Sequence, residues 1–168
     1  MAENASLIIR AARSADGPAL ACIYNPYILD TVVTFEEEPV DAAEMAERVT
    51  AVRALSLPWL VAECNGKVVG YAYARRWRTR ASYRYSSETT VYLEPGQGGN
   101  GYGFRLYAAL LEALAEGGIH AAIGGIALPN AASVALHEKL GFTRVAQFPE
   151  VGFKLGRWVD VGYWQKLL

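Results

Sequence analysis

The chain has 168 residues, of which 52% are hydrophobic and 20% charged, and its formal net charge is -1. This length suits one domain that buries its own core without disulfides or a metal ion, so we expect a single domain over residues 1–168. The near-neutral charge provides no general attraction to polyanions, and nucleic acid is not an expected partner.

Targeting and cysteine signals are also absent from the sequence. The first six residues contain an acid and neither a basic stretch nor an apolar region, so they do not resemble a secretory signal. No apolar run approaches the roughly 20 residues that span a bilayer, and we expect a cytoplasmic protein without membrane contact. Cys22 and Cys64 form no metal-ligand spacing and are predicted to be buried, reduced thiols, with no metal site.

The first third of the chain predicts one strand and two helices. A weakly alternating strand covers residues 7–11, and Pro18 after a short polar segment marks the start of a helix. Asp41, with Glu44 three residues later, resembles a capping box before a second amphipathic helix. Pro58 ends that segment.

A β-hairpin is the clearest local prediction. Two apolar runs, residues 59–64 and 68–74, flank Asn65 and Gly66, a pair favoured in tight type I′ turns. Residues 87–93 are rich in Thr, Val and Tyr and predict a further strand. A glycine-dense loop follows this strand directly.

The second half of the chain alternates helices and strands. A helix with leucines on one face follows the glycine loop and ends at Gly117 and Gly118. The remaining predicted elements are a buried strand at 120–127, a short helix at 130–140, and strands at 142–148 and 158–167. Because neighbouring strands are joined both by hairpins and by helices, the fold class is mixed α/β.

The glycine loop is the feature that most directly indicates a ligand. The strand 88–93 runs into 97–103 and then into a helix, so unpaired backbone N–H groups gather at the positive end of that helix. This arrangement suits a pyrophosphate. The spacing fits neither a dinucleotide fingerprint, since Leu106 stands where a third glycine belongs, nor a P-loop. A flexible hairpin tip with no ligand is the remaining alternative.

Two blocks of sequence carry a family resemblance. Glu88 to Phe104 and Leu128 to Phe142 look like the acetyl-CoA signature of the GNAT acetyltransferases. Within that superfamily the chain resembles most closely the phosphinothricin and methionine sulfoximine acetyltransferases, through these blocks and through Gly152 to Trp158. The resemblance implies a central mixed, mostly antiparallel sheet flanked by helices, acetyl-CoA as cosubstrate, and a homodimer.

The resemblance also assigns residues to the acetyl-CoA site. In the family a Gln or Arg usually stands where this chain has Gly98, so one side-chain contact to the pyrophosphate is missing. The backbone donors that follow are retained. The expected acetyl-CoA contacts are Val91, Tyr92, Leu93, Gly99, Asn100, Gly101, Tyr102, Gly103, Phe104, Asn130 and Ser133.

Acetyl transfer to an amine needs a base, because an ammonium group has no lone pair and aliphatic amines are protonated at neutral pH. By resemblance Glu88 is this base, and strand alternation places it on one face with Thr90 and Tyr92. His137 stands where many GNAT enzymes have a tyrosine that protonates the departing thiolate. The alternatives are a surface carboxylate, a structural histidine, and Tyr92 or Tyr107 as the acid.

Five arginines interleaved with aromatic residues between positions 75 and 85 indicate where the acceptor binds. Arginine forks bind carboxylates, phosphinates or sulfoximine oxygens, although the same composition is also found in single-strand nucleic-acid sites. We expect a small amino-acid analogue acetylated on its α-amine. The alternatives are another amine, such as a protein N-terminus, a polyamine or an aminoglycoside, and a non-catalytic CoA-binding module. The expected substrate contacts are Phe35, Trp77, Arg78, Thr79, Arg80, Tyr83, Glu88, Thr89 and Thr90.

Overall fold

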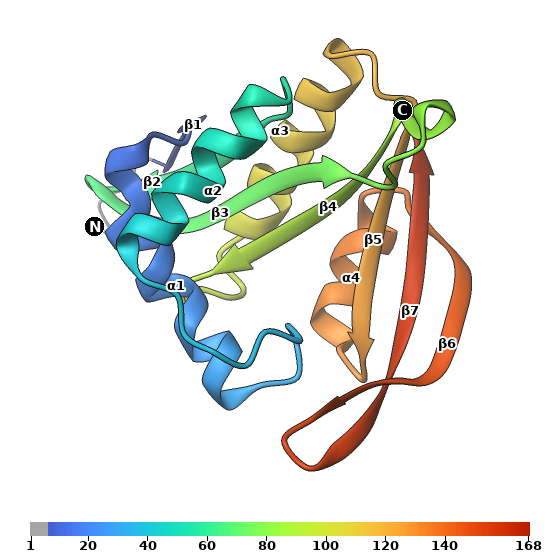
Figure 1. Ribbon diagram of the computed structural model, residues 1–168. Helices are drawn as coiled ribbons and strands as arrows, with labels where there is room; N and C mark the ends of the chain where they lie inside the picture. The colour runs from blue at the N-terminus through green and yellow to red at the C-terminus, as the bar shows by residue number, and fades with distance from the viewer. Residues whose placement is uncertain (1–6) are drawn as a thin grey trace.

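A seven-stranded sheet organises the computed structural model, which describes residues 7–168 (Figure 1). Its strand order is β1-β2-β3-β4-β5-β7-β6, and every neighbouring pair is antiparallel except β4 and β5. The prediction of a mixed, mostly antiparallel sheet flanked by helices is confirmed. The strands are β1 (Leu7–Ala11), β2 (Trp59–Cys64), β3 (Lys67–Arg76), β4 (Ser86–Leu93), β5 (Ala121–Leu128), β6 (Thr143–Lys154) and β7 (Arg157–Leu167).

Helices cover both faces of the sheet. On one face α1 and α2 pack through buried residues such as Leu20 and Met45, and on the other α3 packs through Leu106 and Leu110. The leucine face predicted for α3 is confirmed, and each such side chain contributes about 1.5–3 kcal/mol when fully buried. The helices are η1 (Ser14–Asp16), α1 (Gly17–Asp30), α2 (Ala42–Ala54), η2 (Ala81–Tyr83), α3 (Tyr102–Glu116) and α4 (Ala131–Lys139).

Local sequence signals fix several element boundaries as expected. Asn65 and Gly66 both have positive φ, 51° and 78°, as a type I′ turn between β2 and β3 requires. Asp41 caps α2 by accepting a hydrogen bond from the Glu44 amide at 2.8 Å. These residues satisfy backbone groups that would otherwise lack partners, so the elements begin and turn where the sequence predicts.

The C-terminal strands are longer than predicted. β6 continues to Lys154 instead of ending near residue 148, and it turns into β7 through Leu155 and Gly156, both with positive φ. Pro149 and an irregularity of the register between Phe148 and Gly152 interrupt the alternation of apolar and polar residues. The sequence pattern therefore did not predict the second half of the strand. The result is a long hairpin that extends beyond the rest of the sheet.

One prediction about the cysteines is wrong. Cys22 is exposed, because the face of α1 that packs on the sheet is formed by Leu20, Ile23 and Tyr24. Cys64 is half-buried, and both thiols are free. Across residues 7–168, no helix combines the length and apolarity needed to cross a membrane, and no group of three or more metal-ligating side chains occurs.

Candidate active site

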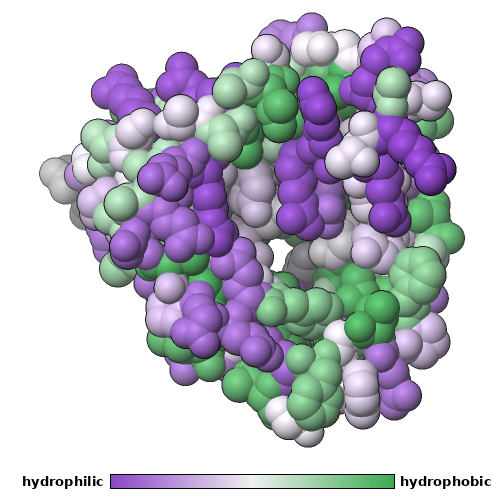
Figure 2. Space-filling view, in the orientation of Figure 1, coloured by the Kyte–Doolittle hydropathy of each residue, from purple (hydrophilic) through white to green (hydrophobic). Residues whose placement is uncertain are grey.

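The site begins where β4 and β5, the only parallel strand pair within residues 7–168, separate. Strands β4 and β5 pair from Ser86 to Glu88 with Ala121 to Ile123, and beyond these rungs they diverge. Each strand remains bonded to its outer neighbour, β4 to β3 and β5 to β7, so the separation belongs to the sheet itself. We call this opening the fork. Figure 2 shows the molecule hollowed at this place, in the orientation of Figure 1.

The glycine loop lies at the far end of β4 and leads into α3. Gly101 caps the helix with φ 77°, a left-handed conformation that glycine adopts without strain. The first main-chain helical bond runs from the Arg105 amide to the Gly101 carbonyl, and within the described chain the amides of Tyr102, Gly103 and Phe104 have no main-chain acceptor. These donors and the helix dipole form an anion site of the kind that holds a pyrophosphate.

The predicted acetyl-CoA contacts lie on both sides of the fork and along the glycine loop. Asn130 and Ser133 lie across the fork at the start of α4, where the Asn130 side chain accepts the Ser133 amide at 3.1 Å. Asn130 is therefore the N-cap of α4 and also lines the fork. Three of the other predicted contacts lie on β4 and six on the loop and helix start, namely Val91, Tyr92 and Leu93, and Gly99, Asn100, Gly101, Tyr102, Gly103 and Phe104.

A larger cavity, of about 500 Å³, opens on the α1 side of the sheet. Glu88, Thr90 and Tyr92 line it from β4, which confirms the strand alternation expected from the sequence. Thr90, Tyr92 and Gly125 also line the fork, so the cavity and the fork are continuous. Thr89, predicted as a substrate contact, faces α3 on the opposite side of β4 and lines only the fork. We call this larger space the acceptor cavity.

Glu88 lies at the junction of the fork and the acceptor cavity. Its Oε2 atom receives both Nε and Nη2 of Arg75, each at 2.9 Å, from the directly opposite position on β3. Burial, the largest single influence, lowers the pKa of Arg75, but the charge and hydrogen bond of Glu88 together with the nearby tyrosines raise the pKa overall. The Glu88 side chain is 19% exposed, and its Oε1 atom lies beside Gly125 at the fork. One carboxylate oxygen is thus held while the other faces the opening.

The C-terminal hairpin closes one wall of the acceptor cavity. A Cβ atom at Gly152 would lie 2.3 Å from the Phe35 ring, so only glycine leaves room for this ring against β6. Lys154 is buried and donates to the Thr34 carbonyl at 2.8 Å. The two residues fix the segment that carries Phe35, which lines the cavity as expected. Gly152 and Lys154, both within the segment Gly152 to Trp158 that carries part of the family resemblance, therefore position a wall of the cavity.

The predicted arginines lie elsewhere. Arg78 stacks over Trp77, and Trp77 packs edge-on against Tyr163, a residue of the acceptor cavity. Arg80 and Tyr83 lie at the two ends of η2, and Thr79 directly precedes them. None of the predicted contacts on this segment lines the cavity: Trp77, Arg78, Thr79, Arg80 and Tyr83. Of the five arginines in the patch predicted from the sequence, Arg75 alone lines the cavity, although the expected substrate contacts did not include it. Polar and aromatic lining residues that the sequence did not indicate are Tyr24, Glu36, Tyr73 and Tyr163.

A sequence signal for Arg75 does exist. Tyr71, Tyr73 and Arg75 alternate along β3 and therefore share one face, with Arg75 opposite Glu88 in the antiparallel register. Using that signal requires the register, which depends on the length of the loop between the two strands. The positional clue was present, but the pairing was not visible in the sequence.

A buried polar chain connects the fork to α3 and α4. Tyr107 is fully buried, and its hydroxyl lies 2.6 Å from Thr89 Oγ1 and 3.0 Å from His137 Nε2. Thr89 also reaches the Ile123 carbonyl at 3.2 Å, on the last paired rung of β5. His137 Nδ1 lies 2.7 Å from the Ser133 carbonyl, which can only accept. His137 therefore carries a proton on Nδ1.

The environment keeps this chain neutral. Burial lowers the pKa of His137, although the Ser133 carbonyl partly offsets the effect, and burial raises the pKa of Tyr107. A neutral His137 with its proton on Nδ1 has only an acceptor lone pair at Nε2. His137 is 4% exposed and packs so closely that a Cβ at Gly124 would lie 2.3 Å from Nε2. Both ring nitrogens are thus engaged by protein groups.

The sheet forks at a parallel strand pair, with an anion-binding helix start on one side and a cavity that contains the Glu88 carboxylate on the other. This arrangement defines an acyltransferase, whose two substrates meet across the fork. The chain matches the model of the acetyltransferase (GNAT) domain over residues 9–162. It belongs to the GNAT acetyltransferase family.

Relatives with assigned activities match nearly the whole chain. An L-methionine sulfoximine/L-methionine sulfone acetyltransferase of Salmonella typhimurium is 40% identical over 95% of this chain and 93% of its own length. A phosphinothricin N-acetyltransferase of Streptomyces viridochromogenes is 38% identical over 98% and 89%. A phosphinothricin acetyltransferase structure from Sinorhizobium meliloti, in complex with acetyl-CoA, has a TM-score of 0.93 at 36% identity, covering 96% of this chain and 88% of that one.

Proposed function

We propose that the protein transfers the acetyl group of acetyl-CoA to the α-amine of a small amino-acid analogue of the methionine sulfoximine or phosphinothricin type. The continuity of the fork with the acceptor cavity, with Glu88 at their junction, is the observation that carries this proposal. The names of the relatives supply the substrate class. The geometry supplies a place for each reactant.

The residues of the fork and loop fit acetyl-CoA. The amides of Tyr102, Gly103 and Phe104 would hold its pyrophosphate, and the facing edges of β4 and β5 offer main-chain groups to its amide-containing arm. When bound, acetyl-CoA supplies an acetyl thioester. Asn130 and Ser133 contribute from the α4 side of the fork. The residues between Val91 and Phe104 that the sequence predicts as acetyl-CoA contacts are also proposed to bind it here.

Glu88 is the proposed general base. The acceptor ammonium must lose a proton before its nitrogen can attack, and the Oε1 atom at the fork is placed to take it directly or through water, an effect worth about 10² to 10⁴ in rate. Arg75 holds the other oxygen and keeps the carboxylate oriented. After the amine attacks, its nitrogen loses another proton, which passes to the departing thiolate. The products are the amide and the free CoA thiol, and no dedicated acid is needed.

The acceptor's anionic end needs a cation that Glu88 has not already engaged. Arg75 is committed to Glu88, whereas Arg78 and Arg80 have no acidic partner within residues 7–168. These two arginines are proposed to bind the anionic end from outside the cavity lining, where Arg78 stacks over Trp77 and Trp77 packs against Tyr163 of the cavity wall. Phe35 and Thr90 line the cavity and are proposed substrate contacts, as are Thr79 and Tyr83 from the segment outside the lining, while Thr89 serves the fork.

His137 is proposed as a positioning residue. Its Nε2 atom, which lacks a proton, accepts from the Tyr107 hydroxyl, so it has no proton to give to a thiolate. Through Tyr107 it holds Thr89, which reaches the last rung before the fork. The width of the opening is then set by this buried chain.

A homodimer is part of the proposal. The β6–β7 hairpin exposes large apolar side chains on one continuous strand pair: Phe148, Val151, Phe153, Leu155 and Trp158 are each 52–62% exposed. An apolar surface of this kind is typical of an interface between subunits. Measurement of mass in solution should give twice the chain mass, and a charged substitution at Trp158 should give the monomer.

The first test follows release of the free CoA thiol from acetyl-CoA with purified protein and a panel of acceptors: methionine sulfoximine, phosphinothricin, a polyamine, an aminoglycoside and a peptide N-terminus. Turnover confined to the first two is expected. Glu88→Gln should reduce kcat by about 10² or more and leave acetyl-CoA binding unchanged. Turnover on another amine alone would move the substrate, and acetyl-CoA binding without any turnover would favour a non-catalytic module.

A further inference from the structure

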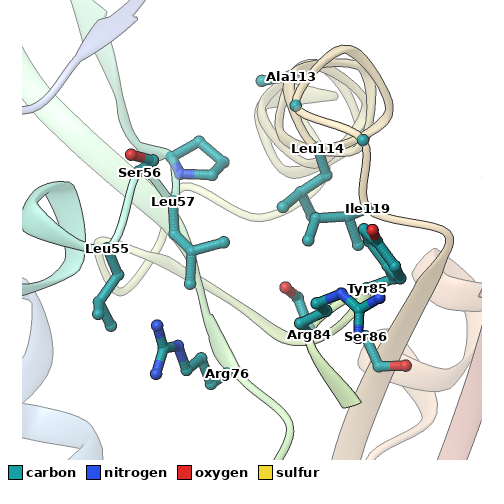
Figure 3. A pocket seen from close by; sticks show the side chains of 14 residues that line it. Leu55, Ser56, Leu57, Arg76, Arg84, Tyr85, Ser86, Ala113, Leu114 and Ile119 are labelled. Carbon is teal, nitrogen blue, oxygen red and sulfur yellow. The ribbon is translucent and has the colours of Figure 1, made fainter. Parts of the chain in front are cut away.

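A separate cavity, of about 230 Å³, lies at the start of β4, at the opposite end of that strand from the glycine loop. It shares no lining residue with the fork or the acceptor cavity. Figure 3 shows its walls: the ends of β3 and β4, the C-terminal end of α3, and the segment between α2 and β2. The proposed acetyl transfer uses none of these residues.

Two arginines face this cavity without an acidic partner. Arg76 from β3 and Arg84 from the segment before β4 both line it, and Figure 3 labels both side chains there. The Arg84 guanidinium stacks over the Tyr85 ring and donates to the Ala81 carbonyl at 3.2 Å. Within residues 7–168 neither forms a salt bridge, in contrast to Arg75, which is paired with Glu88. Strand alternation puts Arg75 and Arg76 on opposite faces, so the paired arginine serves the acceptor cavity and the unpaired one serves this cavity.

A buried hydroxyl in the same wall also has no partner. Ser87 is 0% exposed and lines the cavity, and its Oγ atom meets no hydrogen-bond partner among the described residues. It lies directly opposite Arg76 in the β3–β4 register. Buried hydroxyls are nearly always hydrogen-bonded, because burying one without a partner costs free energy. Ser87 is therefore an unsatisfied hydroxyl just beneath the cavity wall, and a ligand completes its hydrogen bonding when the side chains that cover it shift aside.

The rest of the wall is apolar and small. Leu57, Leu114 and Ile119 line the cavity between the arginines and α3 (Figure 3). The C-terminal end of α3 carries partial negative charge, so the anionic end of a ligand belongs on the side of the arginines. The volume is below the roughly 300–1,000 Å³ of pockets for drug-sized ligands. A short ligand with one anionic end fits this distribution of charge and size.

We propose that this cavity is a second ligand site, which binds a small carboxylate with a short branched apolar tail. Arg76 and Arg84 hold the carboxylate, Ser87 completes its hydrogen bonding, and the tail lies against Leu57, Leu114 and Ile119. Arginine's planar fork is suited to a carboxylate. The site is independent of the acetyl-transfer reaction and stands whether or not that function is confirmed.

Titration calorimetry with isovalerate tests the site on the full-length protein. Arg76→Gln and Arg84→Gln should each weaken binding by about ten- to a hundredfold, the equivalent of one charge-assisted hydrogen bond. Arg75→Gln is the matched control, since it removes the neighbouring arginine on the other face and should bind isovalerate like the wild type. The reverse pattern would place the carboxylate in the acceptor cavity and overturn the proposal.

Two further measurements separate ligand binding from general effects on the fold. Ser87→Ala removes a hydroxyl that has no partner, so the free protein should unfold at the same or a higher temperature while isovalerate binds several-fold more weakly. Isovaleramide, which has the same shape without the charge, should bind at least about tenfold more weakly than isovalerate. Equal affinity for the amide and the carboxylate, or no isovalerate binding by the wild type, would refute the site.

Discussion

Replacing Tyr107 with Phe tests whether the buried chain positions the fork. The substitution deletes one hydroxyl and keeps the ring, which packs 5.6 Å from Phe142 between ring centres. The deleted oxygen lies 2.6 Å from Thr89 and 3.0 Å from His137. Because both partners are almost fully buried, water cannot replace the lost hydroxyl without a rearrangement.

The cost follows from the groups left without a partner. A buried acceptor that loses its hydrogen bond costs about 1–3 kcal/mol, and here the acceptor is Nε2 of His137. For a domain of this size each kcal/mol lowers the melting temperature by about 2–4 °C, so we expect a decrease of about 2–12 °C. The loosened Thr89 should also change the width of the fork, and the KM for acetyl-CoA should rise more than kcat falls.

Thermal unfolding and steady-state kinetics over a range of pH are the assays. If His137 acts only by holding Tyr107, His137→Gln should reproduce the kinetic effect of Tyr107→Phe, and the double variant should be little worse than either, since the three groups form one chain. The pH dependence of kcat should keep its shape in all three. A His137→Gln enzyme that loses kcat about a hundredfold and one limb of that profile, while Tyr107→Phe remains normal, would instead make His137 the proton donor.

Three other perturbations give separate tests. Gly152→Ala should push the Phe35 ring out of its place and raise the KM for the acceptor severalfold, with the KM for acetyl-CoA unchanged in the same assay. Gly98→Arg should tighten acetyl-CoA binding measured by calorimetry, because the position has open space and lies beside the anion site. Since burial lowers the pKa of His137, the unfolded chain takes up its proton first as the pH falls below about 6.5, and stability is lost there. His137→Gln should reduce this loss in melts between pH 7.5 and 5.5.

Much of the fold is readable from the sequence because local chemistry decides it. The turn at Asn65 and Gly66, the cap at Asp41 and the leucine face of α3 each rest on residues within one or two turns of chain. The end of β6 was not readable, because Pro149 interrupts the alternation. There the strand is held by its partner β7 across the hairpin, and pairing overrides the local pattern.

The acetyl-CoA half of the site, like the turn and the helix cap, depends on local sequence. The glycine loop and the start of α3 are contiguous in sequence, and their free amides arise from the geometry of any helix start. The acceptor half depends on contacts between distant segments, such as Arg75 with Glu88 and Phe35 with Gly152. These contacts depend on strand register and on the path of the hairpin. The sequence pattern therefore indicated all five arginines between positions 75 and 85, and the family resemblance favoured Arg78 and Arg80, which lie on the segment after β3.

The fork depends on how the two parallel strands are connected, which no single residue indicates. Parallel strands cannot be joined by a tight turn, so β4 and β5 are connected through α3, and that crossover places the anion-binding helix start at the far end of the open strand. The last paired rung, at Glu88 and Ile123, then carries Glu88, the proposed base, on one face of the sheet and meets the Thr89, Tyr107 and His137 chain on the other. In the proposed reaction, binding, orientation and proton transfer all converge there because the sheet opens at that rung.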